Sequence, residues 1–140
     1  MNRDISSIRR DYQLASLDEA STAANPMDQF GHWWEEAIQS NIDEVNAFTL
    51  STIALNGAPT ARVVLLKGFT PEGFVFFTNY ESNKGKEIAA HPIVAMNFFW
   101  KELERQVRIN GTIKKVSTEE SEQYFHSRPL GSQVGAWTSP

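Results

Sequence analysis

Apolar residues recur at helical spacing in the first third of the chain. One side of residues 5–17 is apolar, which predicts a short helix there. Asn25 followed by Pro26 is typical of a helix start, with an N-cap side chain before a proline at the first helical position. The stripe that follows predicts a helix to about Ser40, and we interpret it as core packing in preference to a ligand platform: Phe30, Trp33, Trp34, Ala37 and Ile38.

From Ala47 onward, the apolar period changes to that of β-strands. A turn that favours positive φ is expected at Asn56-Gly57, and the Ala-Pro pair after it favours a loop longer than two residues. Residues 63–66 are apolar at every position, which predicts a strand buried on both faces. Five segments are expected to be strands, namely residues 48–55, 60–67, 73–79, 93–100 and 105–116.

Two further helices are expected around and after the last strands. Residues 82–91 predict a brief helix that ends before Pro92. Ser117 and Glu120 form a capping box, which opens a helix that carries Tyr124. Strands joined mostly by hairpins, with helices at the ends and in one crossover, predict a mainly β fold whose antiparallel sheet closes toward a barrel.

We expect residues 1–140 to form a single domain. Residues 1–45 would be its N-terminal helical segment, residues 46–116 its barrel strands, and residues 117–140 a helix and the start of another segment. A barrel of this kind needs a further strand to cover its last edge, and no such strand follows in the sequence. We therefore expect one or more C-terminal strands to be missing.

Composition argues against several classes of function. With 140 residues, of which 41% are hydrophobic, the chain can form one domain with a core. A net charge of −4 argues against a nucleic-acid binder that relies on bulk attraction. The chain has no cysteine, and His32, His91 and His126 lack ligand spacing, so no metal site is expected. Because no apolar run has membrane length and the N-terminus does not resemble a signal peptide, we expect a cytoplasmic protein.

Three hydrogen-bond donors lie at intervals of four residues near the end of the sequence: Tyr124, Arg128 and Ser132. Helical spacing puts the first two on one face, and a Pro-Leu-Gly turn lets the third converge on them. A guanidinium fork with two hydroxyls and no acid among them suits a phosphate ester.

A second group of polar residues favours another anion. Arg62 and Lys67 bracket the apolar run, although charges at both ends of a strand also serve solubility. Residues 78–86 pass from a strand into a helix and bring hydroxyls, backbone N–H groups and Lys84 to a helix N-terminus, which favours phosphate binding. Strand alternation is expected to turn Gln106 inward, where the edge of a flavin would satisfy its amide.

Together these motifs resemble the pyridoxamine 5′-phosphate oxidase family. The resemblance implies the FMN-binding split-barrel fold, with FMN at a homodimer interface. It also implies FMN-dependent oxidation of pyridoxamine 5′-phosphate or pyridoxine 5′-phosphate to pyridoxal 5′-phosphate in vitamin B6 metabolism, with O2 reduced to H2O2. The matching segments are residues 62–67 (Arg-Val-Val-Leu-Leu-Lys), 76–79 (Phe-Phe-Thr-Asn), 82–84 (Ser-Asn-Lys), 104–107 (Glu-Arg-Gln-Val), 124–129 (Tyr-Phe-His-Ser-Arg-Pro) and 132–133 (Ser-Gln).

The resemblance further implies roles for individual residues. Since the flavin supplies the redox chemistry, no catalytic acid or base is expected among them. FMN would be bound by Arg62, Val63, Val64, Leu65, Leu66, Lys67, Phe77, Thr78, Asn83, Lys84 and Gln106. The substrate would be bound by Arg9, Arg10, Asp11, Tyr12, Lys67, Tyr124, Arg128 and Ser132.

The chain departs from the family pattern in two ways. Asn83 stands where the family usually has arginine, and the loss of this cation predicts FMN binding weaker by about tenfold or more. The family's C-terminal segment is absent, so the chain resembles a truncated member. Two alternatives therefore stay open, a non-catalytic flavin-binding protein on the same barrel and an inactive fragment. A related flavin reductase is disfavoured, because it would lack the trio of Tyr124, Arg128 and Ser132.

Overall fold

The computed structural model describes residues 4–13, 17–78 and 83–115. These residues form two compact units. The first unit contains the chain up to Val45 together with Phe99–Gln106, and the second contains Asn46–Phe98 together with the residues from Val107 onward.

The first unit contains helix α1, Pro26–Gln39. Its start follows from local chemistry, because the Asn25 side chain accepts the backbone N–H of Met27 at 2.7 Å. Pro26 occupies the first helical turn, where a missing N–H costs no hydrogen bond. The predicted helix is therefore confirmed, including the residue at which it begins.

An aromatic cluster forms the core of this first unit. The ring centroid of Trp100 lies 5.9 Å from that of Phe30 and 6.2 Å from that of Trp34. The indole N–H of Trp100 donates to the carbonyl oxygen of Val45 at 3.0 Å, so its polar atom is satisfied inside the core. Core packing is thus confirmed for Phe30, Ala37 and Trp34, whereas Trp33 is half-buried and Ile38 is 45% exposed.

The N-terminal segment contradicts the helix expected over residues 5–17. In its described part only Ile5–Ser7 is helical, as a single 3-10 turn whose first N–H groups are capped by Asp4. Ile5 and Ile8 are 79% and 63% exposed. Because these side chains bury little apolar surface, nothing offsets the cost of nucleating a longer helix.

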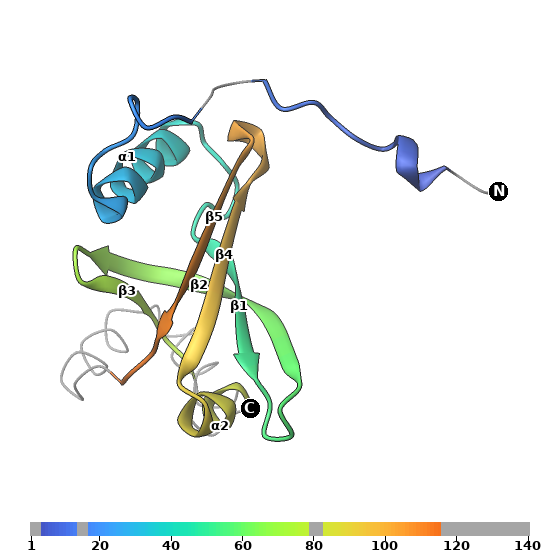
Figure 1. Cartoon of the computed structure of the whole chain (residues 1–140), viewed down its shortest axis with the longest axis vertical. Coiled ribbons are helices and arrows are strands. Elements are labelled where there is room, and N and C mark those ends of the chain that lie inside the picture. Colours follow the sequence, from blue (N-terminus) through green and yellow to red (C-terminus); the bar gives the residue numbers. More distant parts are fainter. Residues whose placement is uncertain (1–3, 14–16, 79–82, 116–140) are drawn as a thin grey trace, which may run out of the picture. The chain divides into compact units, whose positions relative to one another are not determined.

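The sheet has five strands in the order β3-β2-β1-β4-β5, and the paired strands β1–β2, β1–β4 and β2–β3 are antiparallel (Figure 1). This confirms the predicted mainly β fold with an antiparallel sheet and a helix in its crossover. The 3-10 turn Lys101–Leu103 joins the last two strands. The elements are β1 (Ala47–Ile53), β2 (Pro59–Thr70), β3 (Gly73–Phe76), α2 (Asn83–Ala90), β4 (Ile93–Trp100) and β5 (Arg105–Thr112).

Two strands end earlier than predicted, β3 at Phe76 and β5 at Thr112. For β5 the reason lies in its neighbour: β4 begins at Ile93, and the N–H of Ile113 already bonds to the carbonyl of Pro92 at 2.8 Å. Residues beyond this point have no strand residue of β4 opposite them.

The turn between β1 and β2 is longer than two residues, as expected. Ala54 donates its N–H to the carbonyl of Ala58 at 2.7 Å, and Gly57 has φ +88°. A side chain at Gly57 would be strained in this left-handed conformation. The turn sets the register of the hairpin, which pairs Ala47 with Leu65 and Ile53 with Pro59.

Only one face of β2 is buried, so the prediction of burial on both faces was wrong. Val64 and Leu66 are 8% and 4% exposed, whereas Val63 and Leu65 on the opposite face are 68% and 38% exposed. The apolar run therefore combines core residues with residues on an uncovered outer face.

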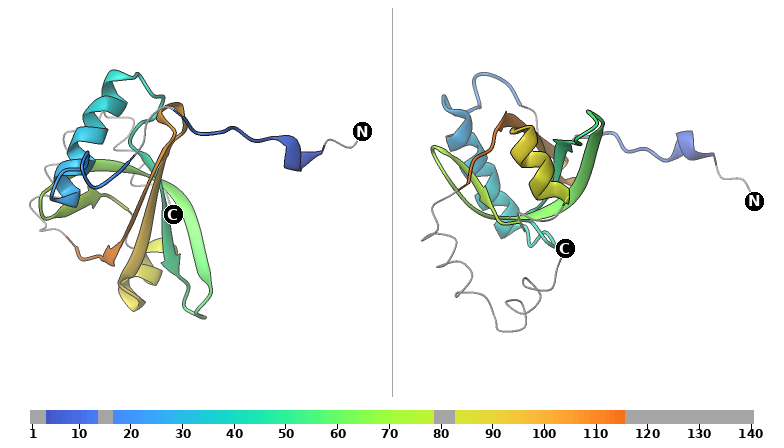
Figure 2. Two further views of the ribbon diagram at one scale, coloured as in Figure 1. Left: turned by 45° about the horizontal axis from the view of Figure 1, so that its top comes forward. Right: turned by 90° about the horizontal axis from the view of Figure 1, so that it is seen from below.

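The core of the second unit lies on the inner face of this sheet. Phe48, 2% exposed, has its ring centroid 5.6 Å from that of Phe76 and 5.2 Å from that of Phe98. Helix α2 lies beside the end of the β1–β2 hairpin (Figure 2). The aromatic rings thus fill the middle of the sheet, and α2 covers one end of it.

We expect Phe48→Ala to destabilise the fold by about 3–5 kcal/mol, because it removes a buried ring that two other rings contact. Urea unfolding followed by circular dichroism measures this change. The control is Leu55→Ala in the β1–β2 turn, where a residue 68% exposed should cost no more than about 0.5 kcal/mol. Equal losses in the two variants would contradict the assignment of the core.

Candidate functional site

The residues predicted to bind a cofactor along β2 divide between the two faces of the strand. Arg62, Val64 and Leu66 point to the inner face, as the alternating burial shows. Val63, Leu65 and Lys67 are exposed on the outer face. The motif at residues 62–67 therefore presents two surfaces, and no single ligand surface can include all six side chains.

Arg62 lies in a polar network that closes the inner face of the β1–β2 hairpin. Its Nη1 donates to the hydroxyl of Thr52 at 2.6 Å and to the carbonyl of Leu50 at 3.2 Å. Its Nη2 donates to the hydroxyl of Thr60 at 2.7 Å and to Oε2 of Glu87 at 3.1 Å. Each terminal nitrogen thus has two acceptors within the protein, and the guanidinium is held in one orientation.

Glu87, on α2, is the acid of this network. It is 8% exposed, and a single carboxylate oxygen accepts from Thr52 at 2.5 Å and from Thr60 at 2.9 Å in addition to Arg62. The hydrogen bond from Thr52, assisted by Thr60 and the Arg62 charge, holds the pKa of Glu87 below its ordinary value, although burial acts in the opposite direction. Glu87 is therefore a carboxylate at neutral pH.

A cavity of about 280 Å³ lies between β3, α2 and the residues after β5. Thr78, one of the predicted cofactor residues, lines it, and its hydroxyl is buried without a hydrogen-bond partner among the described residues. A buried hydroxyl without a partner is uncommon in proteins and indicates a place where a further polar group belongs. The lining consists of Phe74, Val75, Phe76, Phe77, Thr78, Gly85, Ile88, Ala89, Pro92, Ile113, Lys114 and Lys115.

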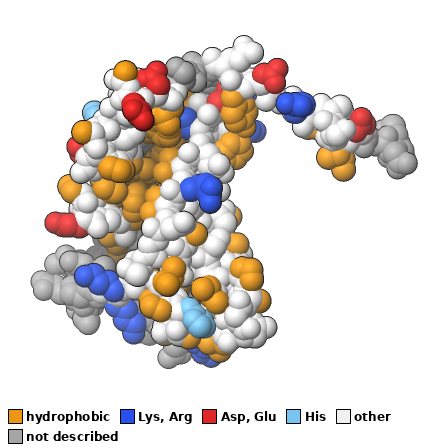
Figure 3. Space-filling model, in the orientation of Figure 1, with side chains coloured by type: hydrophobic (Ala, Val, Ile, Leu, Met, Phe, Trp, Pro, Cys, Tyr) orange, Lys and Arg blue, Asp and Glu red, His pale blue; other side chains and the backbone are white. Residues whose placement is uncertain are grey.

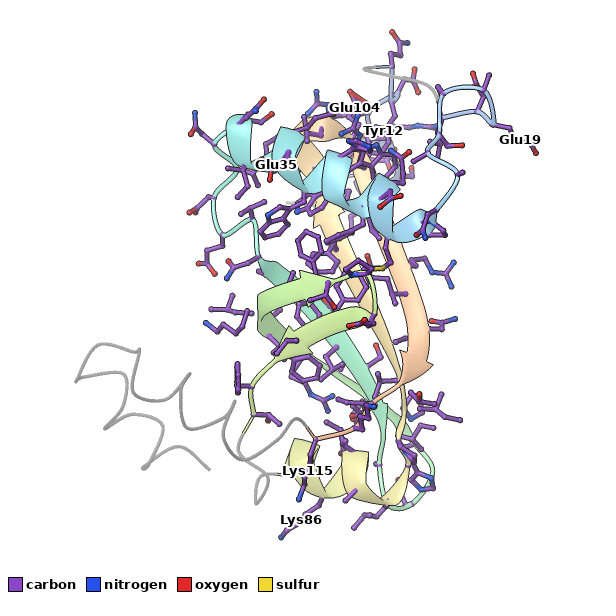
Figure 4. The ribbon with its side chains drawn as sticks, turned by 90° about the vertical axis from the view of Figure 1, so that its left-hand side faces the viewer. Tyr12, Glu19, Glu35, Lys86, Glu104 and Lys115 are labelled. Atoms are coloured by element: carbon purple, nitrogen blue, oxygen red, sulfur yellow. The ribbon has the colours of Figure 1, made fainter. Side chains whose placement is uncertain are left out.

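Basic side chains gather at the same end of the second unit. Lys114 and Lys115 line the cavity, and Lys86 is exposed on α2. Figure 3 shows Lys and Arg side chains on the surface around α2 and the end of β5. Figure 4 places Lys86 and Lys115 beside α2. The mouth of an otherwise apolar cavity is therefore positively charged, which suits a ligand with an apolar body and an anionic group.

The remaining predicted site residues that the structure describes belong to the first unit. Arg9, Arg10, Asp11 and Tyr12 are all exposed. The neighbouring backbone N–H of Gln13 donates to Glu104 at 3.0 Å, and Figure 4 shows Tyr12 beside Glu104. The N-terminal segment is thus fastened to the turn between β4 and β5.

Gln106 is exposed, so the expectation that it turns inward was wrong. Side chains along β5 alternate between the two faces of the strand, and the neighbours Arg105 and Val107 occupy the less exposed face. Arg105 stacks on Trp33, with the guanidinium carbon 4.6 Å from the ring centroid, and pairs with Glu36. Gln106 and Arg105 both line a second cavity of about 720 Å³ within the first unit, together with Trp33 and Glu36.

Several predicted residues lie outside the described part of the chain. These are Tyr124, Arg128 and Ser132, together with the side chains of Asn83 and Lys84. Conversely, sequence reasoning missed Glu87, Thr52 and Thr60. The available signal was alternation, because Thr52 follows Phe48 and Leu50 on the inner face and Thr60 precedes the inward Arg62. An arginine on the inner face of a sheet requires a partner of opposite charge.

The chain matches the pyridoxamine 5′-phosphate oxidase family over residues 34–140. It is 56% identical, over 135 residues, to a pyridoxine/pyridoxamine 5′-phosphate oxidase of Burkholderia ambifaria; this alignment covers 96% of the chain and 63% of that relative. The enzyme of the same name from Bordetella petrii is 52% identical over 96% of the chain and 64% of its own length. The chain therefore belongs to the pyridoxamine 5′-phosphate oxidase family, and it spans a little under two thirds of these relatives.

Solved structures confirm the split-barrel fold class. PhzG from Burkholderia lata 383, in complex with tetrahydrophenazine-1-carboxylic acid, superposes with a TM-score of 0.83 at 21% identity, over 89% of this chain and 62% of PhzG. A pyridoxamine 5′-phosphate oxidase-related, FMN binding protein from Nostoc punctiforme PCC 73102 gives a TM-score of 0.64 at 16% identity, over 85% and 68%. At these identities the likeness concerns the fold.

None of the helices in the described part of the chain has the length and apolarity that a bilayer crossing requires.

We expect acid to weaken the folded state through Glu87. Because the folded pKa is lowered, this carboxylate stabilises the fold fully above its ordinary pKa of 4.5, and the contribution is lost as the pH falls through the lowered value. Urea unfolding of the parent and of Glu87→Gln should differ most near neutral pH and converge in acid. Glu72→Gln, which changes an exposed acid in the same unit, should follow the parent. A pH-independent difference for Glu87→Gln would contradict the network.

Proposed function

We propose that this chain binds FMN and acts in the FMN-dependent oxidation of pyridoxamine 5′-phosphate or pyridoxine 5′-phosphate to pyridoxal 5′-phosphate. Relatives named for this reaction share more than half of its residues over nearly its whole length, which supports the proposal. Bound FMN would supply the oxidation, with O2 as the final acceptor and H2O2 as its product. The protein's own part is to bind, orient and shield the reacting groups.

The observation that carries the proposal is the buried Thr78 hydroxyl, which has no hydrogen-bond partner in the part of the chain that the structure describes. It lies in a cavity with a basic mouth, next to the first turn of α2, where backbone N–H groups have no partner within the helix. Such a donor set fits the phosphate of FMN. Lys84, carried on that first turn, and Thr78 would hold this end of the cofactor.

The cavity fits only a part of FMN. Its volume of about 280 Å³ is close to the lower limit of roughly 300 Å³ for ligand sites. The remainder of the cofactor would lie along the exposed outer side of β2, with Lys67 beside it, and Gln106 would bond the edge of its ring. Arg62, whose terminal N–H groups all bind protein acceptors, would act on the phosphate end through the network that it forms with Glu87 on the inner face.

The substrate phosphate is assigned to the last part of the chain. Tyr124, Arg128 and Ser132 offer two hydroxyls and a bidentate guanidinium, and Lys67 would add a further cation. The N-terminal residues Arg9, Arg10, Asp11 and Tyr12 would fold over the bound substrate. Anchoring a phosphate far from the reacting carbon orients that carbon without a catalytic acid or base.

We further propose that two copies of the chain associate in the cytoplasm. The outer face of the sheet exposes Val63 and Ile93, which are 68% and 61% accessible. Apolar strand positions of this kind need a cover, and a second copy supplies one while bringing its own residues toward the flavin.

The visible spectrum of the purified chain with FMN tests the cofactor, and peroxide release on adding pyridoxamine 5′-phosphate tests the reaction. We expect a flavin spectrum and turnover. A yellow protein without turnover would favour the non-catalytic alternative, and a colourless protein would contradict FMN binding.

We expect Arg128→Ala to raise the KM for pyridoxamine 5′-phosphate about tenfold or more, because the variant loses a charged hydrogen bond to the substrate phosphate, and to leave FMN retention unaffected. An unchanged KM would remove Arg128 from the substrate site.

We expect Thr78→Val to weaken FMN binding roughly fivefold, the value of one neutral hydrogen bond, because it removes the hydroxyl and keeps the shape of the side chain. Quenching of flavin fluorescence during titration measures the change in Kd. Thr112→Val, at an exposed position of β5, is the matched control and should bind FMN like the parent. Parent-like affinity in Thr78→Val would assign the hydroxyl to some other partner.

A further inference from the structure

The polar network around Glu87 joins three elements at one atom. Oε2 of Glu87, on α2, accepts hydrogen bonds from Thr52 on β1 and from Thr60 and Arg62 on β2. Three donors converging on one oxygen define its position tightly, because any displacement lengthens several bonds at once. The network therefore fixes α2 against the hairpin.

Glu87 is also placed to govern the phosphate end of the proposed cofactor site. Its contact with Arg62, at 3.1 Å, ties α2 to β2. Asn83 and Lys84, where α2 begins, precede it by about one helical turn. The position of this first turn, with its backbone N–H groups, thus depends on how firmly the helix is held one turn later.

The chemistry of Arg62 requires such a partner. Its side chain is 24% exposed, and each of its terminal nitrogens donates two hydrogen bonds to protein acceptors. Without Glu87, the guanidinium would lose its only carboxylate contact among the described residues and would keep its bonds to Leu50, Thr52 and Thr60. Because its four terminal N–H groups are all donated to protein acceptors, Arg62 serves to hold Glu87, and with it α2, in place.

We propose that Glu87 is the positioning residue of the FMN phosphate site, and that the network it forms with Arg62 acts through the start of α2. This inference rests on the proposed FMN binding. Glu87 does not touch the cofactor in this arrangement. It sets the position of the backbone N–H groups that do.

The test compares FMN with riboflavin, which has the same ring system and no phosphate. We expect Glu87→Gln to weaken FMN binding about tenfold, because the first turn of α2 is then no longer held in its binding position, and to leave riboflavin binding unchanged. Flavin fluorescence titration gives both Kd values. Equal weakening for the two flavins, or no weakening for FMN, would overturn the proposal, because a generally loosened fold does not distinguish them.

A double-mutant cycle tests whether Glu87 and Arg62 act as one network that holds α2. In an Arg62→Gln background, Glu87→Gln should change the Kd for FMN much less than it does in the parent, since coupled residues are not additive. Fully additive effects would overturn this part of the proposal. Glu72→Gln, which removes the same charge at an exposed position, is the control and should bind both flavins like the parent.

A second variant and the behaviour of the parent protein separate the possible outcomes. If Glu87→Gln does not fold, Thr60→Val removes one of the three bonds to Oε2 and should still weaken FMN binding selectively. If the parent binds FMN and these variants bind it equally well, the positioning role fails alone. If the parent does not bind FMN, the proposed function fails, and the role of Glu87 fails with it.

Discussion

An arginine on the inner face of a sheet needs a negative partner, and in this protein the whole end of the β1–β2 hairpin is arranged around that need. The strand register places Thr52 opposite Thr60 and Leu50 opposite Arg62, so the polar groups accumulate beyond the aromatic core. Glu87 compensates the positive charge of Arg62, and this contact attaches α2 to the β1–β2 hairpin. Removing either Arg62 or Glu87 would leave the other charge without its partner, which costs more folding free energy than the intact pair contributes. The fold therefore depends on both residues being present.

Much of the fold could be predicted because local signals agreed with the tertiary structure. Asn25 and Pro26 mark the start of α1, and alternation with turn residues locates all five strands. The failures have a common physical cause. The apolar positions near Ile8 and at residues 63–66 show which side chains could be buried. Whether they are buried depends on the parts of the protein that pack against them. No neighbouring surface covers Ile8 or Val63 in the described chain.

The candidate site was less predictable, because its interactions join distant parts of the sequence. Thr78 was predicted from its motif, and its buried hydroxyl has no hydrogen-bond partner among the residues that the structure describes. Glu87 was missed, since its partners lie 25 to 35 residues earlier in the sequence. For Gln106, alternation alone left two choices of face, and the contacts of Arg105 with Trp33 and Glu36 select the outer one. The phosphate trio at the C-terminus remains a prediction from sequence.

The distribution of tryptophans has a practical consequence. Trp33, Trp34 and Trp100 all lie in the first unit, and Trp137 is outside the described residues. Indole emission therefore reports chiefly on the packing around α1, while the phenylalanine-rich sheet of the second unit is almost silent at those wavelengths. Optical melting curves and backbone signals thus sample different halves of the protein, and a gap between them would reveal stepwise loss of structure.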